Sequence, residues 1–115
     1  MTAKKTSYFV AILLLGLALA GCERKSISEI NADPGRFMHK EVVVAGRVTQ
    51  SIGAFGHGIY QVDDGTGAIW VYARNSGVPS KGAMVGVKGH VMPTITFLGL
   101  NYATVIQETA RRHAG

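Results

Sequence analysis

Residues 60–74 read YQVDDGTGAIWVYAR and have the pattern of a β-hairpin. Two runs rich in Ile, Val, Tyr and Trp flank Asp64-Gly65-Thr66-Gly67, and Asp-Gly is favoured where a tight reversal needs a positive φ. In the second run, strand alternation places three apolar residues on one face, and two aromatic residues and a cation on the other. The first set is Ile69, Val71 and Ala73, and the second is Trp70, Tyr72 and Arg74. The second face is suited either to stacking on a flat ligand or to packing under another segment.

A second pattern, V-x-V-x-G-x-V, occurs twice. Its first copy is Val42, Val44, Gly46 and Val48, in a strand expected over 41–50, and its second is Val85, Val87, Gly89 and Val91, in a strand expected over 84–92. Glycine inside a strand commonly marks a bulge or a bend where another backbone comes close. The repeat therefore predicts two strands in comparable positions of one closed or strongly bent sheet.

A short helix is expected before the first strand. Ser26-Ile27-Ser28-Glu29 has the S-x-x-E form of a capping box, and Ile27 and Ile30 could face the core. Asp33-Pro34-Gly35 is expected to end the helix, because Pro disfavours helical geometry in the residue before it.

The remaining segments are predicted to be loops, one further strand and a tail. The sequence predicts a mobile glycine-rich loop at 51–58, a turn segment at 75–82, and a loop through Pro93, Phe97 and Gly99. A fifth strand is expected from about Leu100 to Gln107, followed by a frayed basic tail over 109–115. Five short strands with glycine-rich bends predict a small barrel.

The first 21 residues have the order of an export signal. Lys4 and Lys5 precede an apolar run over 9–20, which is too short for a transmembrane helix of roughly 20 apolar residues. Leu19-Ala20-Gly21-Cys22 then resembles the lipobox of bacterial lipoproteins, and this resemblance implies an acylated Cys22 as the mature first residue. An ordinary secreted protein with an unrelated cysteine is the alternative. By the same resemblance, Glu23 after the cysteine points to the outer membrane of a Gram-negative source.

Composition limits the mature chain to one small domain. About 90 residues remain after the leader, enough for one hydrophobic core. Cys22 is the only cysteine, so an intrachain disulfide is excluded. The 12 Lys and Arg outnumber the 7 Asp and Glu, but two of the lysines lie in the leader, and nucleic-acid binders usually show more concentrated basic patches. The predicted divisions are a signal peptide at 1–21, a lipidated tether at 22–25, a barrel domain at 26–108 and a basic tail at 109–115.

The motif order resembles the bacterial OB-fold nucleic-acid-binding family, whose domains are similar to tRNA-anticodon-binding domains. That order is V-x-V-x-G-x-V, Tyr60-x-Val62-x-Asp64-Gly65-Thr66-Gly67-x-Ile69-x-Val71, Pro79-x-x-Gly82 and a second V-x-V-x-G-x-V, over 42–106. The resemblance implies an all-β fold with one short N-terminal helix, a five-stranded OB-fold barrel. One departure is that 75–82 is too short for the helix that many OB-folds place between the third and fourth strands, so the Ser26 helix is the candidate cap.

The resemblance also implies a binding groove across the second and third strands, with the adjoining loops as walls. Carried over to this sequence, that groove comprises Gln61, Trp70, Tyr72 and Arg74, with Phe55, His57 and Phe97 at its edges. The alternative for Trp70 and Tyr72 is burial under the N-terminal helix or the tail.

Catalytic and metal sites are not expected. Adjacent strand residues point to opposite faces, so Asp63 and Asp64 cannot act as paired carboxylates, and Asp64 is explained by its turn. The four histidines, His39, His57, His90 and His113, lack metal-ligand spacing. The OB-fold haem chaperones attach haem at a histidine motif that none of the four matches, so no cofactor is expected.

Two functions remain open for a lipid-anchored, non-enzymatic module of the bacterial cell envelope. The first is binding of an extended ligand, such as single-stranded nucleic acid or an oligosaccharide, by stacking and cations. The second is a protein-protein adaptor that docks an envelope partner on the same face or on a sheet edge, without binding nucleic acid.

Overall fold

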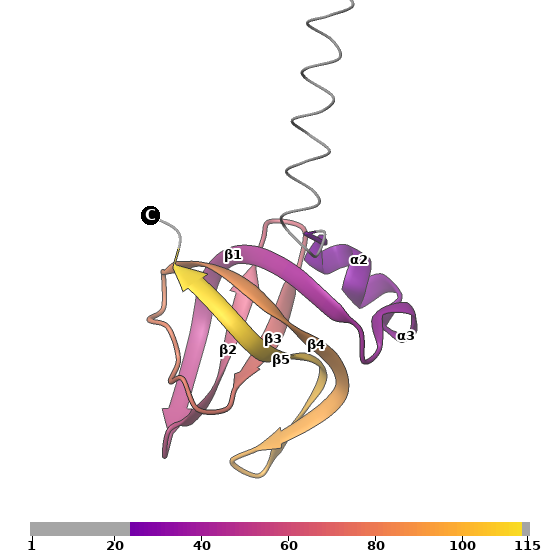
Figure 1. Ribbon diagram of the computed structural model, residues 1–115. Coiled ribbons are helices and arrows are strands. Elements are labelled where there is room, and N and C mark those ends of the chain that lie inside the picture. Colours follow the sequence, from indigo (N-terminus) through magenta and orange to yellow (C-terminus); the bar gives the residue numbers. More distant parts are fainter. Residues whose placement is uncertain (1–23, 114–115) are drawn as a thin grey trace, which may run out of the picture.

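The computed structural model describes residues 24–113, which form two short helices and a barrel of five strands (Figure 1). The elements are α2 (Ile27–Ala32), α3 (Pro34–Phe37), β1 (Glu41–Ala54), β2 (His57–Asp63), β3 (Ala68–Ala73), β4 (Met84–Phe97) and β5 (Leu100–His113). The strands close in the order β1-β2-β3-β5-β4, in which β3 and β5 pair in parallel and the other neighbours are antiparallel. This architecture confirms the predicted all-β, OB-like five-stranded barrel.

The predicted hairpin is present as β2 and β3. Its turn is closed by the bond from Asp64 N–H to the Gly67 carbonyl at 3.2 Å, and Gly65 has a φ of +89°. One carboxylate oxygen of Asp64 accepts bonds from the Thr66 N–H at 2.8 Å and the Thr66 hydroxyl at 2.5 Å. The side chain of Asp64 therefore reinforces the backbone turn, as the Asp-Gly pattern predicts.

The two V-x-V-x-G-x-V segments lie side by side in β1 and β4. Val44 is paired with Val87, and each glycine is paired with a valine of the other copy: Gly46 with Val85, and Gly89 with Val42. A Cβ at Gly46 would overlap the backbone carbonyl of Asp63, and one at Gly89 would overlap that of Gln107. Both glycines thus allow the close backbone approach that their positions predicted.

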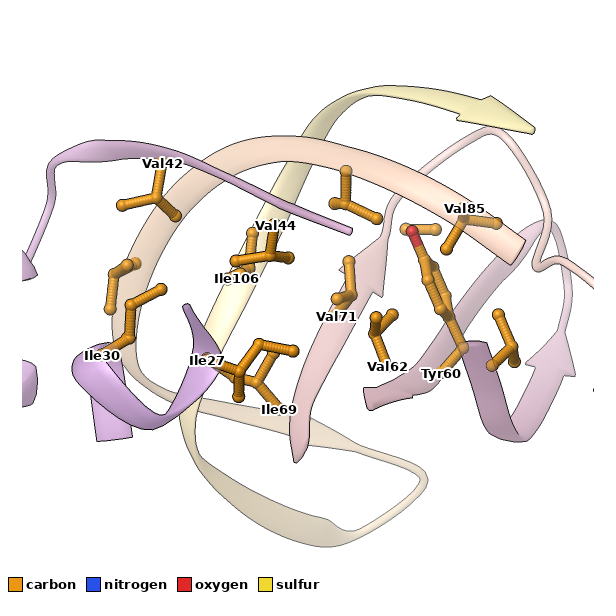
Figure 2. Close-up of a cluster of buried hydrophobic side chains, with 14 of the residues drawn as sticks. Ile27, Ile30, Val42, Val44, Tyr60, Val62, Ile69, Val71, Val85 and Ile106 are labelled. Carbon is orange, nitrogen blue, oxygen red and sulfur yellow. The ribbon is translucent and has the colours of Figure 1, made fainter. Parts of the chain in front are cut away.

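The barrel interior holds the main core, and α2 closes one end of it. Ile27 and Ile30 are fully buried in the same cluster as Val42 and Ile69, and Figure 2 shows them at one end of this cluster with Tyr60 toward the other. Ser26 begins the helix by accepting a bond from the Glu29 N–H at 3.3 Å. The predicted helix with Ser26 as its N-cap, and the use of this helix as a barrel cap, are therefore confirmed.

Several predicted boundaries were wrong. The glycine-rich loop at 51–58 and the loop at Pro93 to Gly99 are replaced by long hairpins: β1 runs to Ala54, β4 runs to Phe97, and each turn has only two residues. Residues 109–113 belong to β5 and are not a frayed tail. Asp33 ends α2 as expected, but Pro34 then begins α3, because proline suits the first turn of a helix. The extra strand residues come from hairpin pairing, which a single-segment pattern does not reveal.

Candidate ligand-binding face

The outer side of β2 and β3 carries the aromatic residues singled out by the sequence. On β3, Ile69, Val71 and Ala73 are buried toward the core, whereas Trp70 and Tyr72 are half-buried on the opposite side. Gln61 of β2 is paired with Trp70, and Ile59 with Tyr72, so these residues share the outer face. The period of two thus places the two rings as predicted.

Five rings on this outer side form two contacting groups, one of three rings and one of two. We call them together the aromatic face: His57, Tyr72 and Phe97, and Trp70 and Tyr102. Tyr72 lies between His57, whose ring is nearly parallel at 6.4 Å, and Phe97, which meets it edge-on at 6.2 Å. The Tyr72 hydroxyl is also 3.4 Å from Nδ1 of His57. Trp70 meets Tyr102 edge-on at 5.0 Å. Edge-to-face contacts of this kind hold the rings in fixed orientations.

The far end of the β4–β5 hairpin, residues 93–104, covers part of this face, and we call this segment the arm. Its internal pairs alternate, so that Ile95, Phe97, Leu100 and Tyr102 share one side and Thr94, Thr96, Asn101 and Ala103 the other. The apolar side contacts β3 through Phe97 and Tyr102. Trp70 and Tyr72 are therefore partly covered by the arm.

The pairing of residues in the β4–β5 hairpin is interrupted at Pro93 and Thr104, where the arm begins and ends. These two residues fall between the pairs Met92 with Val105 and Thr94 with Ala103. Thr104 has a φ of +54°, which is a strained conformation for a β-branched residue. Pro93 lacks an N–H to offer a neighbouring strand. The interruption thus combines one strained residue and one proline at the base of the arm.

The other predicted site residues lie around the aromatic face. The Gln61 side-chain oxygen accepts bonds from Thr49 Oγ1 at 3.0 Å and Gln50 Nε2 at 3.2 Å, which orients the amide. Phe55 lies in the β1–β2 turn and is 96% exposed, and Arg74 is exposed just beyond β3. In the described part of the chain, the cation-π contacts are those of Arg36 on Phe37 and Arg111 on Tyr60, so Arg74 does not stack on the face.

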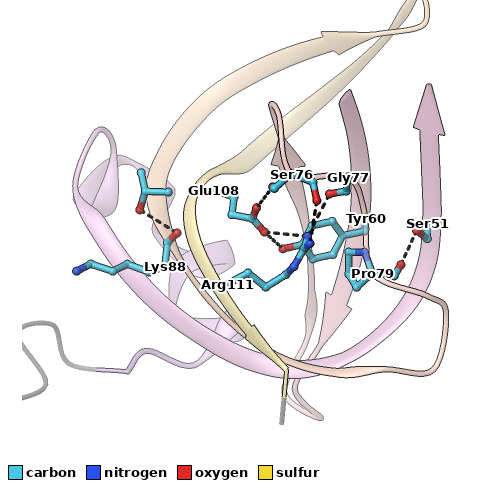
Figure 3. Close-up of polar contacts among 9 residues, drawn as sticks. Ser51, Tyr60, Ser76, Gly77, Pro79, Lys88, Glu108 and Arg111 are labelled. Atoms are coloured by element: carbon cyan, nitrogen blue, oxygen red, sulfur yellow. Dashed lines mark hydrogen bonds and ion pairs between the residues drawn. The ribbon is translucent and has the colours of Figure 1, made fainter. Parts of the chain in front are cut away.

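Sequence reasoning missed Tyr102 and a polar cluster at the barrel end opposite α2. In that cluster the hydroxyl of the buried Tyr60 donates to Glu108, Ser76 donates to Glu108 at 2.8 Å, and Arg111 pairs with Glu108 at 3.2 Å (Figure 3). Burial, followed by the bond to Glu108 and its negative charge, raises the pKa of Tyr60 far above its ordinary value. Arg111 also donates to the carbonyls of Ser76 and Gly77, so the cluster anchors the β3–β4 connection. The sequence signal for this ion pair is the acidic Glu108 three residues before the basic Arg111. It was missed because Arg111 falls in the segment predicted to be a frayed tail.

Residues 24–113 offer neither a metal site nor a membrane-spanning helix. These residues contain no group of three His, Cys, Asp or Glu side chains placed to hold a metal ion. They also contain no helix long and apolar enough to cross a membrane. Cys22 and the predicted leader lie outside the described residues.

Comparison with known proteins supports the barrel. No family model matches the sequence, and no curated protein matches it. Among solved structures, "OBody AM3L09 bound to hen egg-white lysozyme" is 24% identical, covering 68% of this chain and 84% of that one, with a TM-score of 0.54. "OBody AM1L10 bound to hen egg-white lysozyme" is 23% identical, covering 69% and 83%, with a TM-score of 0.50.

A third similar structure is a putative aspartyl-tRNA synthetase from Leishmania major Friedlin. It is 13% identical, covers 79% of this chain and 21% of the synthetase, and has a TM-score of 0.61. This chain therefore corresponds to about a fifth of that enzyme. The likeness is one of fold. At these identities the comparisons establish an OB-like barrel.

Proposed function

We propose that the protein is a non-enzymatic OB-fold module, lipid-anchored in the bacterial cell envelope, that holds an extended ligand on its aromatic face. The observation that carries this proposal is the presence of the half-buried rings of Trp70 and Tyr72 on the outer side of β2 and β3. OB-folds bind oligonucleotides and oligosaccharides across this surface, between the two loops that here are the β1–β2 turn and the arm.

The charge distribution favours an uncharged ligand over a polyanion. Residues 48–62, 68–73 and 92–107 contain no Asp, Glu, Lys or Arg, and Arg74 is the one such cation directly beside β3. Phosphate backbones are held mainly by Lys and Arg, which release counterions on binding. An oligosaccharide, whose rings stack on aromatic side chains, therefore fits this face better than single-stranded nucleic acid does. The likeness to the aspartyl-tRNA synthetase is the observation that favours nucleic acid.

The envelope location rests on the lipobox and on the short distance from Cys22 to the domain. The Lys25 N–H donates to the Val43 carbonyl at 2.8 Å, and Arg24 forms a bridge to the same residue of β1. Contacts with the barrel are thus made already at Arg24, two positions after the cysteine in the sequence. A short tether of this kind would keep the barrel next to the membrane surface.

Fluorescence of Trp70, the single tryptophan, provides the test. A neutral chito-oligosaccharide and a thymidine dodecamer are titrated separately into the domain at about 50 and 200 mM salt, because phosphate binding weakens steeply over this range. We expect the sugar to change the emission at both salt concentrations. Trp70→Ala removes the only tryptophan, so its affinity for the sugar is measured by isothermal titration calorimetry, and we expect binding to be weaker by about 1 to 3 kcal/mol, as for loss of a stacking ring. Tight, salt-sensitive binding of the dodecamer would make nucleic acid the ligand, and no response to either probe would reject both.

A protein adaptor is the second candidate function. It is favoured by the exposed apolar side chains of Phe55 and Leu98 at two hairpin turns, since such side chains often mark protein interfaces. Two of the structurally similar proteins are described as bound to lysozyme, and so to a protein. An adaptor would leave Trp70 emission unchanged in both titrations and would retain a protein partner at high salt.

A further inference from the structure

The turns of the two long hairpins share an unusual geometry. Phe55 and Gly56 have φ values of +55° and +79°, and Leu98 and Gly99 have φ values of +51° and +79°. Two-residue turns of this type favour Asn, Asp or Gly at the first position, because other side chains are strained at positive φ. Here the first positions hold large apolar residues, Phe55 being 96% and Leu98 62% exposed. Neither local conformation nor the core explains these two choices.

Both turns border the same ring. Phe55 and Gly56 directly precede His57, Leu98 and Gly99 directly follow Phe97, and both His57 and Phe97 pack against Tyr72. The exposed apolar side chains near the turns are those of Ile52, Phe55, Leu98 and Leu100. We call these four residues the tip surface, because they lie at the ends of two hairpins separated by Tyr72.

The tip surface is also free of charge. The two segments that form it, residues 48–62 and 92–107, contain no Asp, Glu, Lys or Arg, although the whole chain carries 19 such residues as 12 Lys and Arg and 7 Asp and Glu. Projecting strands are normally protected from other chains by charged side chains, and this protection is lacking here. A matching partner surface is therefore uncharged and apolar.

The tip surface lies far from the α2 end of the barrel. β1 starts beside Arg24, which is bridged to Val43, and reaches the β1–β2 turn only after Ala54. The second strand then returns over seven residues, about 23 Å, to Asp64, whose carboxylate accepts a bond from the Ile27 N–H of α2. Figure 1 accordingly shows α2 near the top and the β4–β5 turn at the bottom. An anchor at Cys22 would hold the α2 end at the membrane and direct the tip surface away from it.

We propose that the tip surface docks an uncharged, apolar surface of a partner protein located on the side of the barrel away from the anchoring membrane. The inference rests on the lipid anchor of the proposed function, because the anchor determines which way the tip surface faces. It names the surface that the protein adaptor, the second candidate function, would use. It does not depend on the ligand of the aromatic face. With the anchor at Cys22, the anchoring membrane lies at the α2 end of the barrel and is excluded as the occupant of the tip surface. A polyanion is excluded because the two hairpin segments carry no cations.

Site-specific photocross-linking in cells that produce the full chain tests this surface. Benzoylphenylalanine is placed at position 55 or 98, and at exposed Arg36 of α3 as a control. We expect positions 55 and 98 to yield an adduct with the same protein, identified by mass spectrometry, and position 36 to yield none of it. Adducts with lipid, adducts only with a second copy of this chain, different proteins at the two positions, or no adduct would each overturn the proposal.

A turn substitution separates docking from folding. Leu98→Asn creates an Asn-Gly turn that suits the φ values of +51° and +79°, so the melting temperature should rise while the adduct from position 55 falls at least tenfold. Met84→Asn removes a side chain that is 41% exposed on β4 outside the two turns, and should leave the adduct intact. An undiminished adduct in Leu98→Asn would overturn the proposal.

Lipidation of the chain is measured separately in the same cells. Fractionation and fatty-acid labelling of the wild-type chain report lipidation, whereas the adduct reports docking. Adducts at positions 55 and 98 in a chain without lipid would support docking of a partner protein and would reject the lipid anchor. A lipidated chain without adducts would reject docking of a partner protein and would support the lipid anchor.

Discussion

The carboxylate of Asp64 accepts a hydrogen bond from the backbone N–H of Ile27 at 2.9 Å, which joins the β2–β3 turn to the first turn of α2. A short helix has several unpaired N–H groups at its start, and an anion is favourable there. Thr66 of the same turn also accepts a bond from the Ser28 N–H at 3.1 Å. The hairpin that organises the sheet therefore also positions the helix that closes the barrel.

This contact predicts acid sensitivity. Desolvation opposes the shift, but bonds from Thr66, Ile27 and Gly67 outweigh it and hold the pKa of Asp64 below its ordinary value. Its contribution to the free energy of unfolding is therefore full above the unfolded pKa of about 3.9 and is lost as pH falls through the lower folded value. We expect Asp64→Ala to destabilise the domain by about 1 to 2 kcal/mol at pH 7 and by less near pH 3.

Urea unfolding at several pH values measures this difference. Asp63→Ala is the matched control, because the Asp63 side chain bonds only the nearby Gly65 N–H, at 2.8 Å, among the hydrogen bonds of the described residues. Equal losses for both variants at every pH would show that the bond to α2 has no special role.

The glycines of the paired motifs predict a second stability difference. Gly46→Val or Gly89→Val should destabilise the barrel by roughly 1 to 3 kcal/mol, because the new side chain meets the backbone of a neighbouring strand. Gly86→Ala is the control, since a Cβ there meets nothing within 4 Å. Gly53 lies in the segment predicted to be a mobile loop, where a substitution is expected to matter little. A Cβ there would lie 3.2 Å from Cγ2 of Val78, so that substitution requires the Val78 side chain to move. Equal thermal midpoints for the Gly46, Gly89 and Gly86 variants would contradict this account.

Tyr102 should control the exposure of Trp70. Because Tyr102 covers Trp70 edge-on at 5.0 Å, Tyr102→Ala is expected to shift the emission to the red and to increase acrylamide quenching while the domain stays folded. Wild-type emission should lie between that of a buried and a fully exposed indole, since Trp70 is half-buried. Tyr102→Phe is the matched control, because it keeps the ring that meets Trp70 and removes only the hydroxyl. Blue emission that Tyr102→Ala does not change would place Trp70 in the core and weaken the ligand-binding proposal.

The polar cluster around Glu108 predicts loss of stability at high pH. The pKa of Tyr60 is raised in the folded state, so folding favours its neutral form and this stabilisation is full below the unfolded pKa of about 10. It is lost as pH rises above that value. Tyr60→Phe should therefore cost about 1 kcal/mol at pH 7 and make unfolding less sensitive to pH between about 9 and 11. Chemical unfolding across that pH interval measures the difference, with Tyr102→Phe as the control because Tyr102 is partly exposed. Equal pH dependence of unfolding in the two variants would refute the idea.

The lipobox predicts that Cys22→Ser prevents membrane attachment or leaves the leader uncleaved. One acyl chain gives only marginal binding, and lasting attachment needs more than one. Labelled fatty acid should enter the wild-type protein and not the variant. Absence of label from the wild type would remove the anchor from the proposed function.

The sequence by itself determined the features set by local chemistry. The Asp64-Gly65 turn, the Ser26 cap, and the inward and outward sets on β3 follow from φ preferences, side-chain bonds to nearby N–H groups and the two-residue period of a strand. The glycines at 46 and 89 were also correctly assigned to close backbone approach, because a strand interior offers few other reasons for glycine.

Only the tertiary structure decided what covers those elements. The extension of β4 and β5, and hence the arm, depends on pairing between segments whose individual composition resembles loops with proline and glycine. Tyr102 meets Trp70, and Glu108 meets Tyr60, across 32 and 48 positions of chain, so neither contact leaves a local pattern. Local preferences select the type of each element, whereas long-range pairing selects which of its faces remains open to a ligand or a partner.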